Sequence, residues 1–88
     1  MSTMVGGNLE QLQALQHQFQ AEAQAVTELQ SRITSSLNDT LWTGPASDRF
    51  REDWNGTFVP ALARLHDALT TNAQVVASRM QAIHDATF

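Results

Sequence analysis

Residues 38–45 have the sequence NDTLWTGP (Asn38 to Pro45) and interrupt a helical pattern near the middle of the 88-residue chain. Asn, Asp, Gly and Pro favour turns, so we predict a break between two helices here. Thr43 or Gly44 can cap the second helix, and Pro45 suits its first turn because the N–H that proline lacks has no helical partner there. Trp42 is expected to pack over the end of the two helices with one edge of its ring exposed to water. Gly44 permits a positive φ or a close backbone approach.

The segment before the break has the apolar spacing of an amphipathic helix. Asn8 is a candidate N-cap with Gln11 three residues later, so helix one is predicted over about residues 8–40, after a flexible lead of residues 1–7. Glutamines occupy the face opposite its apolar stripe. The stripe is about 160° wide and contains Leu9, Leu12, Leu15, Phe19, Ala23, Val26, Leu29, Ile33, Leu37 and Leu41.

The segment after the break has the same helical spacing, so helix two is predicted over about residues 46–85, with the turn at 41–45. Pro60 predicts a kink, with Gly56 and Thr57 absorbing the bend. The second apolar stripe is about 180° wide and contains Ala46, Phe50, Trp54, Phe58, Leu62, Leu65, Leu69, Ala73, Val76, Met80 and Ile83. The fold class is therefore all-α, an antiparallel helical hairpin over residues 8–88.

The width of both stripes predicts a partner, because a single seam between two helices cannot cover them. The simplest assembly is a second hairpin packed face to face in a four-helix bundle. The predicted core and dimer interface contains Leu12, Leu15, Phe19, Val26, Ile33, Leu37, Phe50, Trp54, Phe58, Leu62, Leu65, Leu69, Val76 and Met80. Polar residues within the stripes (Glu22, Gln30 and Asn72) either set the alignment of the partners or lie at the wet edge of the seam.

Composition and charge exclude several classes of function. The net charge is −4 and the five arginines are scattered, so the basic face that nucleic acid or an anionic membrane surface needs is missing. No apolar run reaches the roughly 18 residues of a membrane span, and the first eight residues lack the features of a Sec signal peptide. There are no cysteines, and His17, His66 and His84 have no metal-binding spacing, so neither a metal nor a cofactor is predicted.

Catalysis is not predicted either. The carboxylates at the start of helix two (Asp48, Glu52 and Asp53) suit the positive end of the helix dipole. A hairpin offers no cleft that would hold two carboxylates across a substrate. The chain also has no nucleophile or phosphate-loop pattern, so we expect it not to be an enzyme.

The turn and the residues after it resemble the WXG family of type VII secretion substrates. The similarity covers nearly the whole chain and depends on a mid-chain Trp42-x-Gly44 between two amphipathic helices. The family's small residue after the glycine, and its aromatic residues one and two turns into helix two, fall on Ala46, Phe50 and Trp54.

The resemblance implies a homodimer, or a heterodimer with another WXG-like protein, in a four-helix bundle. It implies synthesis in a bacterial cytoplasm and export by type VII (ESX) machinery without a Sec signal peptide, as a secreted effector subunit or an escort. Many members or their partners carry a Tyr-x-x-x-Asp/Glu export motif after helix two, whereas this chain has no tyrosine, and His84 and Phe88 match neither position. Either the partner supplies the signal, or the natural chain has a longer tail, or this chain is not itself exported.

Two other functions remain open. One is a structural coiled-coil module in which the Trp-x-Gly turn is a coincidence, and a single continuous helix through residues 42–45 would favour it. The other is a membrane-active hairpin, which the net charge of −4 disfavours because it opposes attraction to anionic lipid.

Overall fold

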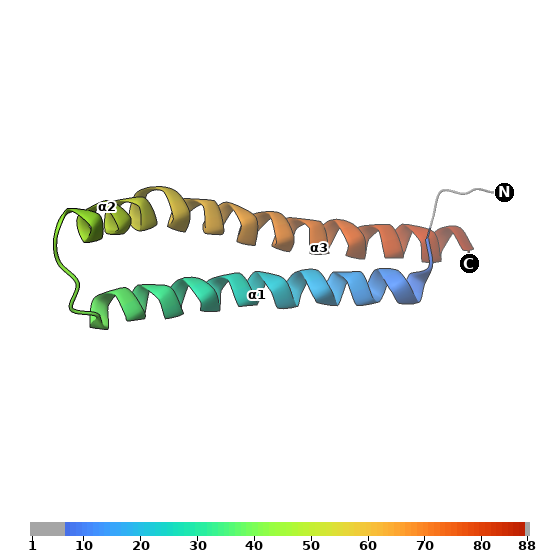
Figure 1. The fold of residues 1–88 in the computed structure, drawn as a ribbon. Helices are drawn as coiled ribbons and strands as arrows, with labels where there is room; N and C mark the ends of the chain where they lie inside the picture. Colours follow the sequence, from blue (N-terminus) through green and yellow to red (C-terminus); the bar gives the residue numbers. More distant parts are fainter. Residues whose placement is uncertain (1–6, 88) are drawn as a thin grey trace.

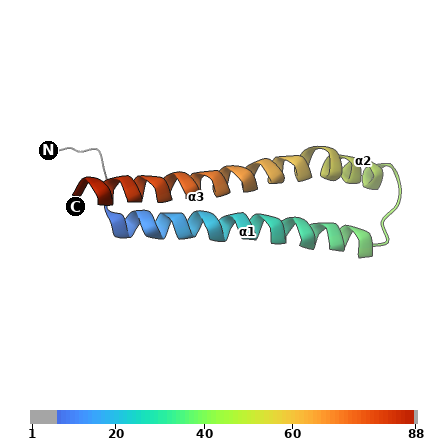
Figure 2. The same ribbon diagram turned by 180° about the vertical axis from the view of Figure 1, so that it is seen from behind.

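The computed structural model describes residues 7–87, and every regular element in that range is helical. Helix α1 spans Leu9–Asp39; the second arm consists of α2 (Pro45–Asp53), the π-helical turn η1 (Trp54–Phe58) and α3 (Val59–Thr87). The two arms lie side by side and antiparallel, with the turn at one end (Figure 1 and Figure 2). The molecule measures 63 × 18 × 14 Å along its principal axes.

The predicted all-α hairpin is thus confirmed, whereas its assembly into a four-helix bundle stays a prediction. Helix one was expected over about 8–40 and helix two over about 46–85; the observed arms span 9–39 and 45–87. The chain is not helical from residue 40 to residue 44, which argues against a continuous coiled-coil helix through the turn. The predicted lead of residues 1–7 lies, apart from Gly7, outside the residues that the structure describes.

Both predicted helix starts are confirmed. The side-chain oxygen of Asn8 accepts a hydrogen bond from the backbone N–H of Gln11 at 3.0 Å, which satisfies one of the free donors of α1. Gly44 is the N-cap of α2 and has a φ of 113°, and Pro45 is the first helical residue. The carbonyl of Gly44 accepts a hydrogen bond from the backbone N–H of Asp48 at 3.0 Å.

The seam between the two arms follows the three- and four-residue spacing of facing helices. Its buried and half-buried residues on α1 include Leu12, Gln16, Phe19, Ala23, Val26, Gln30, Thr34 and Leu37. Those on the second arm include Ser47, Arg51, Trp54, Leu62, His66, Leu69, Ala73, Val76, Met80 and Ile83. Polar side chains therefore share the seam with apolar ones.

The seam buries very little apolar surface completely. Among the described residues, the buried apolar side chains are Ala23, Trp54 and Ala73, which are 5%, 7% and 2% exposed. Two of these three are alanines, which bring the helices close together but remove little area from water. The hairpin by itself therefore lacks a core of the size that normally stabilises helices of this length.

The π turn changes the face that α3 presents to α1. It lies directly before Pro60, whose ring crowds the carbonyl of Gly56 in a regular α-helix, and it includes the two residues where the sequence predicts a bend. The backbone N–H of Val59 binds the carbonyl of Trp54, one residue further back than in an α-helix. Compared with a regular α-helix, this extra residue rotates α3 about its own axis. Leu62 and Ala73 therefore face the seam, whereas the residues before them, Ala61 and Asn72, are exposed.

Candidate docking face and the hairpin end

One side of the hairpin carries an apolar groove of about 620 Å³ between α1 and α3. We call this the apolar groove; it is lined by Gln18, Phe19, Glu22, Ala25, Val26, Leu29, Leu62, Leu65 and Leu69. Leu29 and Leu65 are among the most exposed, with 44% and 47% of their surface open to water. Leu15 and Ile33, also exposed, lie on the same side of α1 at helical spacing and lengthen this surface.

A row of aromatic rings continues this surface toward the turn, since Phe58 lies two helical turns before Leu65 on the same side of the second arm. The ring centroids of Trp42 and Phe50 are 6.2 Å apart, those of Phe50 and Phe58 6.5 Å, and those of Phe58 and Trp54 6.3 Å. These separations and their tilted planes are those of favourable aromatic pairs. Trp42, Phe50 and Phe58 are exposed, and Leu41 beside them is 96% exposed. The apolar surface therefore extends from the middle of the hairpin to its tip.

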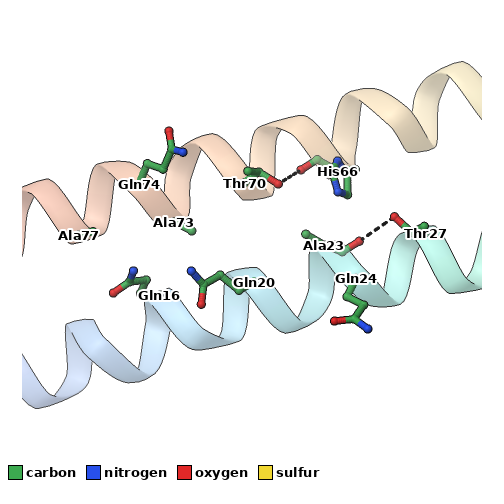
Figure 3. Close-up of a pocket in the computed structure, with 10 residues that line it drawn as sticks. All are labelled: Gln16, Gln20, Ala23, Gln24, Thr27, His66, Thr70, Ala73, Gln74 and Ala77. Carbon is green, nitrogen blue, oxygen red and sulfur yellow. Dashed lines mark hydrogen bonds between the residues drawn. The ribbon is translucent and has the colours of Figure 1, made fainter.

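The opposite side of the hairpin is polar. A groove of about 400 Å³ is lined there by Gln16, Gln20, Ala23, Gln24, Thr27, His66, Thr70, Ala73, Gln74 and Ala77. Figure 3 shows Ala23 and Ala73 between the helices, with Gln24 and Gln74 directed away from the facing helix. The hydroxyls of Thr27 and Thr70 donate to carbonyls one turn earlier in their own helices. Glutamine, threonine and alanine make up most of this lining, in contrast to the leucine, valine and phenylalanine side chains of the apolar groove.

A hydrogen-bond network centred on Arg51 and Ser47 closes the hairpin end. Ser47 is 1% exposed, and its hydroxyl donates to the carbonyl of Trp42 at 2.8 Å and accepts from Nε of Arg51 at 3.0 Å. The terminal nitrogens of Arg51 donate to the carbonyls of Leu37 at 2.9 Å and Thr40 at 3.5 Å. Because α1 has no basic residue in its own last turn, Arg51 supplies the positive charge that favours a helix C-terminus.

Arg51→Ala is expected to lower the free energy of unfolding by about 1–3 kcal/mol, because it leaves two carbonyls and a buried hydroxyl without this donor. Arg51→Lys should recover only part of the loss, since an ammonium keeps the charge but lacks the planar fork. Urea denaturation followed by circular dichroism at one fixed protein concentration measures the free energy of unfolding of both variants. Arg49→Ala, at an exposed position two residues earlier, is the matched control. Equal stability of the Arg51→Ala and Arg49→Ala variants would contradict this role.

Trp54 joins the two arms one turn further along. Its indole N–H donates to the hydroxyl of Thr34 at 3.1 Å, and its ring is nearly buried against the seam. A buried tryptophan normally needs such a partner for its N–H. Together with Arg51, this contact fixes the end of α1 against the start of the second arm.

The predicted interface residues fall into two groups. Half-buried seam positions are occupied by Leu12, Phe19, Val26, Leu37, Leu62, Leu69, Val76 and Met80, and Trp54 is buried. Exposed positions are occupied by Leu15, Ile33, Phe50, Phe58 and Leu65. The first group holds the hairpin together, and the second is available to a partner.

The three polar residues expected within the apolar stripes lie in different places, and Glu22 is exposed in the apolar groove. Gln30 is half-buried in the seam, whereas Asn72 is exposed and its amide donates to the carbonyl of Ala68 in the same helix at 2.7 Å. Their effect on a partner stays a prediction. Pattern analysis missed Ser47, Arg51 and Thr34, because each is polar and gives no apolar signal. Ser47 and Arg51 lie one helical turn apart on α2, which is the spacing of residues on one helix face and could have indicated that pair.

Within residues 7–87, none of the helices has the length and apolar character needed to cross a bilayer. In the same range, no three His, Cys, Asp or Glu side chains are grouped so that they could hold a metal ion. No family model, curated protein or solved structure matches the chain in comparisons with known proteins.

Proposed function

We propose that this chain is a non-enzymatic binding subunit that packs its apolar groove and aromatic row against a second helical hairpin in a four-helix bundle. In this role it is a WXG-like subunit of a type VII secretion system, either part of a secreted effector or an escort for its partner. Its resemblance to that family in Trp42, Gly44, Ala46, Phe50 and Trp54 supports the secretory part of the proposal.

The observation that carries the docking role is the contrast between the two sides of the hairpin. Leucine and phenylalanine side chains remain exposed along one side, while glutamine and threonine line the other. Contiguous exposed apolar surface of this kind is characteristic of an interaction site in a protein that remains in solution. A second hairpin covers such a long, narrow surface with matching geometry.

The position of the aromatic row at the hairpin tip supports the same role. Tryptophan and other aromatic residues are enriched where protein interfaces have their strongest contacts. Trp42, 41% exposed, sits beside the exposed Phe50 and Leu41.

The test compares one charge placed on each side of the same helix. Leu65→Glu puts a carboxylate in the apolar groove, whereas Gln74→Glu puts one at the polar groove. We expect the melting temperature of the unmodified chain to rise with its concentration, because association stabilises it. Leu65→Glu should weaken self-association by roughly tenfold or more, since docking would bury its charge, while Gln74→Glu should leave it unchanged. Light scattering and circular dichroism on the same fractions measure mass and helix content.

The same pair of variants tests the secretory role in the bacterium that encodes the chain. If the bundle is the exported form, Leu65→Glu should be depleted from the culture supernatant, and Gln74→Glu should be present there. A stable, monodisperse and fully helical monomer with a concentration-independent melting temperature would contradict the docking role. Equal amounts of the two variants in the supernatant would contradict export as a bundle.

A further inference from the structure

Glu22 lies in the middle of the apolar groove. It is one turn from Phe19 and one turn from Val26 on α1, and it shares the groove with Leu62, Leu65 and Leu69 of α3. Of the nine residues that line the groove, Glu22 is the only ionisable one, and Gln18 is the only other polar one. In the single hairpin Glu22 is exposed, so water solvates its carboxylate.

Covering the groove changes the surroundings of this carboxylate. A partner that displaces the water must supply a group that compensates the charge, because a buried carboxylate without a counter-charge is strongly unfavourable. A guanidinium or ammonium opposite Glu22 does this most effectively, by a charge-assisted hydrogen bond. The groove therefore favours partners that place a basic side chain at this point.

A second copy of this chain cannot supply that group from the same surface. In a symmetric face-to-face dimer, each copy presents the same patch to the other. The patch carries one carboxylate and no base, since the arginines at positions 32, 49, 51, 64 and 79 are absent from the groove lining. A symmetric dimer would thus bury two carboxylates that lack a counter-charge.

We propose that Glu22 makes the apolar groove selective for a non-identical helical hairpin that carries an arginine or lysine opposite it. This inference rests on the proposed docking function and identifies the chemistry of the partner. Self-association of the chain through the groove, the reaction that Leu65→Glu tests, is then weaker than its association with such a partner, and the charge of Glu22 is what limits it.

The test supplies the missing base on a second copy. Glu22→Arg is mixed in equal amounts with the unmodified chain, and the dissociation constant of the mixed pair is measured by fluorescence energy transfer between labelled chains. We expect the mixed pair to bind roughly tenfold or more tightly than either chain binds itself, with a difference that shrinks as salt is added. Glu22→Gln alone should also self-associate more tightly than the unmodified chain, because it removes the charge and keeps the shape.

Glu28→Arg is the matched control. It makes the same change in charge on the same helix, but Glu28 is absent from the groove lining and its carboxylate accepts from Gln24 at 3.5 Å on the exposed surface. The proposal is overturned if the Glu22→Arg mixture binds no more tightly than the Glu28→Arg mixture. A tight homodimer of the unmodified chain that Glu22→Gln does not strengthen also overturns it.

The docking function and the selectivity fail in different ways. If Leu65→Glu weakens association but Glu22→Arg has no effect beyond its control, the apolar groove remains the docking site and the selectivity is wrong. If Leu65→Glu leaves the mixed pair intact, the groove is not the interface and both proposals fall.

Discussion

Trp54→Ala is expected to lower the free energy of unfolding by about 3–5 kcal/mol, the usual cost of truncating a buried tryptophan. Trp54 is the only large apolar side chain among the buried residues of the described range, and the other two buried apolar residues are alanines. Its loss opens a cavity beside Phe58 and removes the hydrogen bond to Thr34 that joins the two arms. The measurement is urea denaturation followed by circular dichroism at one fixed protein concentration, because association adds to stability.

Two controls separate the contributions of Trp54. Trp54→Phe keeps most of the ring packing but removes the indole N–H, so it should cost less than Trp54→Ala, with about 0.5–1.5 kcal/mol due to the hydrogen bond. Trp42→Ala truncates the other tryptophan, which is exposed in the single hairpin, and should destabilise less than Trp54→Ala. If Trp42→Ala and Trp54→Ala unfold at the same urea concentration, Trp54 is not the anchor of the hairpin.

Gly44→Ala is expected to destabilise the hairpin by about 1–3 kcal/mol through backbone strain alone. Gly44 has a φ of 113° and a ψ of 176°, a region that residues with a Cβ rarely adopt. A Cβ added there would meet no other atom within 4 Å, so steric contact contributes nothing to the cost. Thermal denaturation should show a decrease of about 4–8 °C for each kcal/mol in a chain of this size.

Gly56→Ala is the matched control for Gly44→Ala. A Cβ at Gly56 also meets nothing within 4 Å, but Gly56 lies in the helical second arm, where alanine restricts the unfolded chain without strain. We expect this variant to be as stable as the unmodified chain or more stable by up to about 1 kcal/mol. If both variants lose the same stability, the left-handed conformation of Gly44 is not the cause.

The sequence was sufficient to predict the hairpin because both of its signals are local. Apolar spacing identifies two helices whatever they pack against, and turn chemistry at Gly44 and Pro45 marks the end of one and the start of the other. The cap at Asn8 follows from the same local rules and was found in its predicted place. Each of these features involves residues close together in the chain.

The features that could not be predicted depend on contacts between residues far apart in the sequence, or on the extra residue that changes which face of the helix points to the seam. The apolar spacing placed both Asn72 and Ala73 in the stripe of helix two, and an ideal α-helix would bring Asn72 back to the side of Trp54 after about five turns. The π turn adds one residue, so Ala73 occupies that position and is 2% exposed while Asn72 faces water. The contact between Arg51 and Leu37 spans the turn, and no local pattern indicates it.

The division of the apolar residues into seam and docking surface also required the structure. Helical wheels placed Leu62 and Leu65 in one stripe, but Leu62 is half-buried in the seam and Leu65 is exposed. A wheel gives the direction of a side chain around its own helix, while the neighbouring helix decides which part of a stripe is covered. The same limit applied to Glu22, whose place among leucines is visible only once α3 lies beside α1.

The π turn also affects how this chain is to be compared with other helical hairpins. A hairpin that lacks the widened turn at residues 54–58 reaches the same seam with one residue fewer between its equivalents of Trp54 and Leu62. If the two sequences are aligned without a gap, the residues on one side of the π turn are matched correctly and those on the other side are offset by one position. Comparison of this arm with a hairpin of that kind therefore needs a single-residue gap beside Pro60, so that residues before and after the π turn are each matched to their structural equivalents.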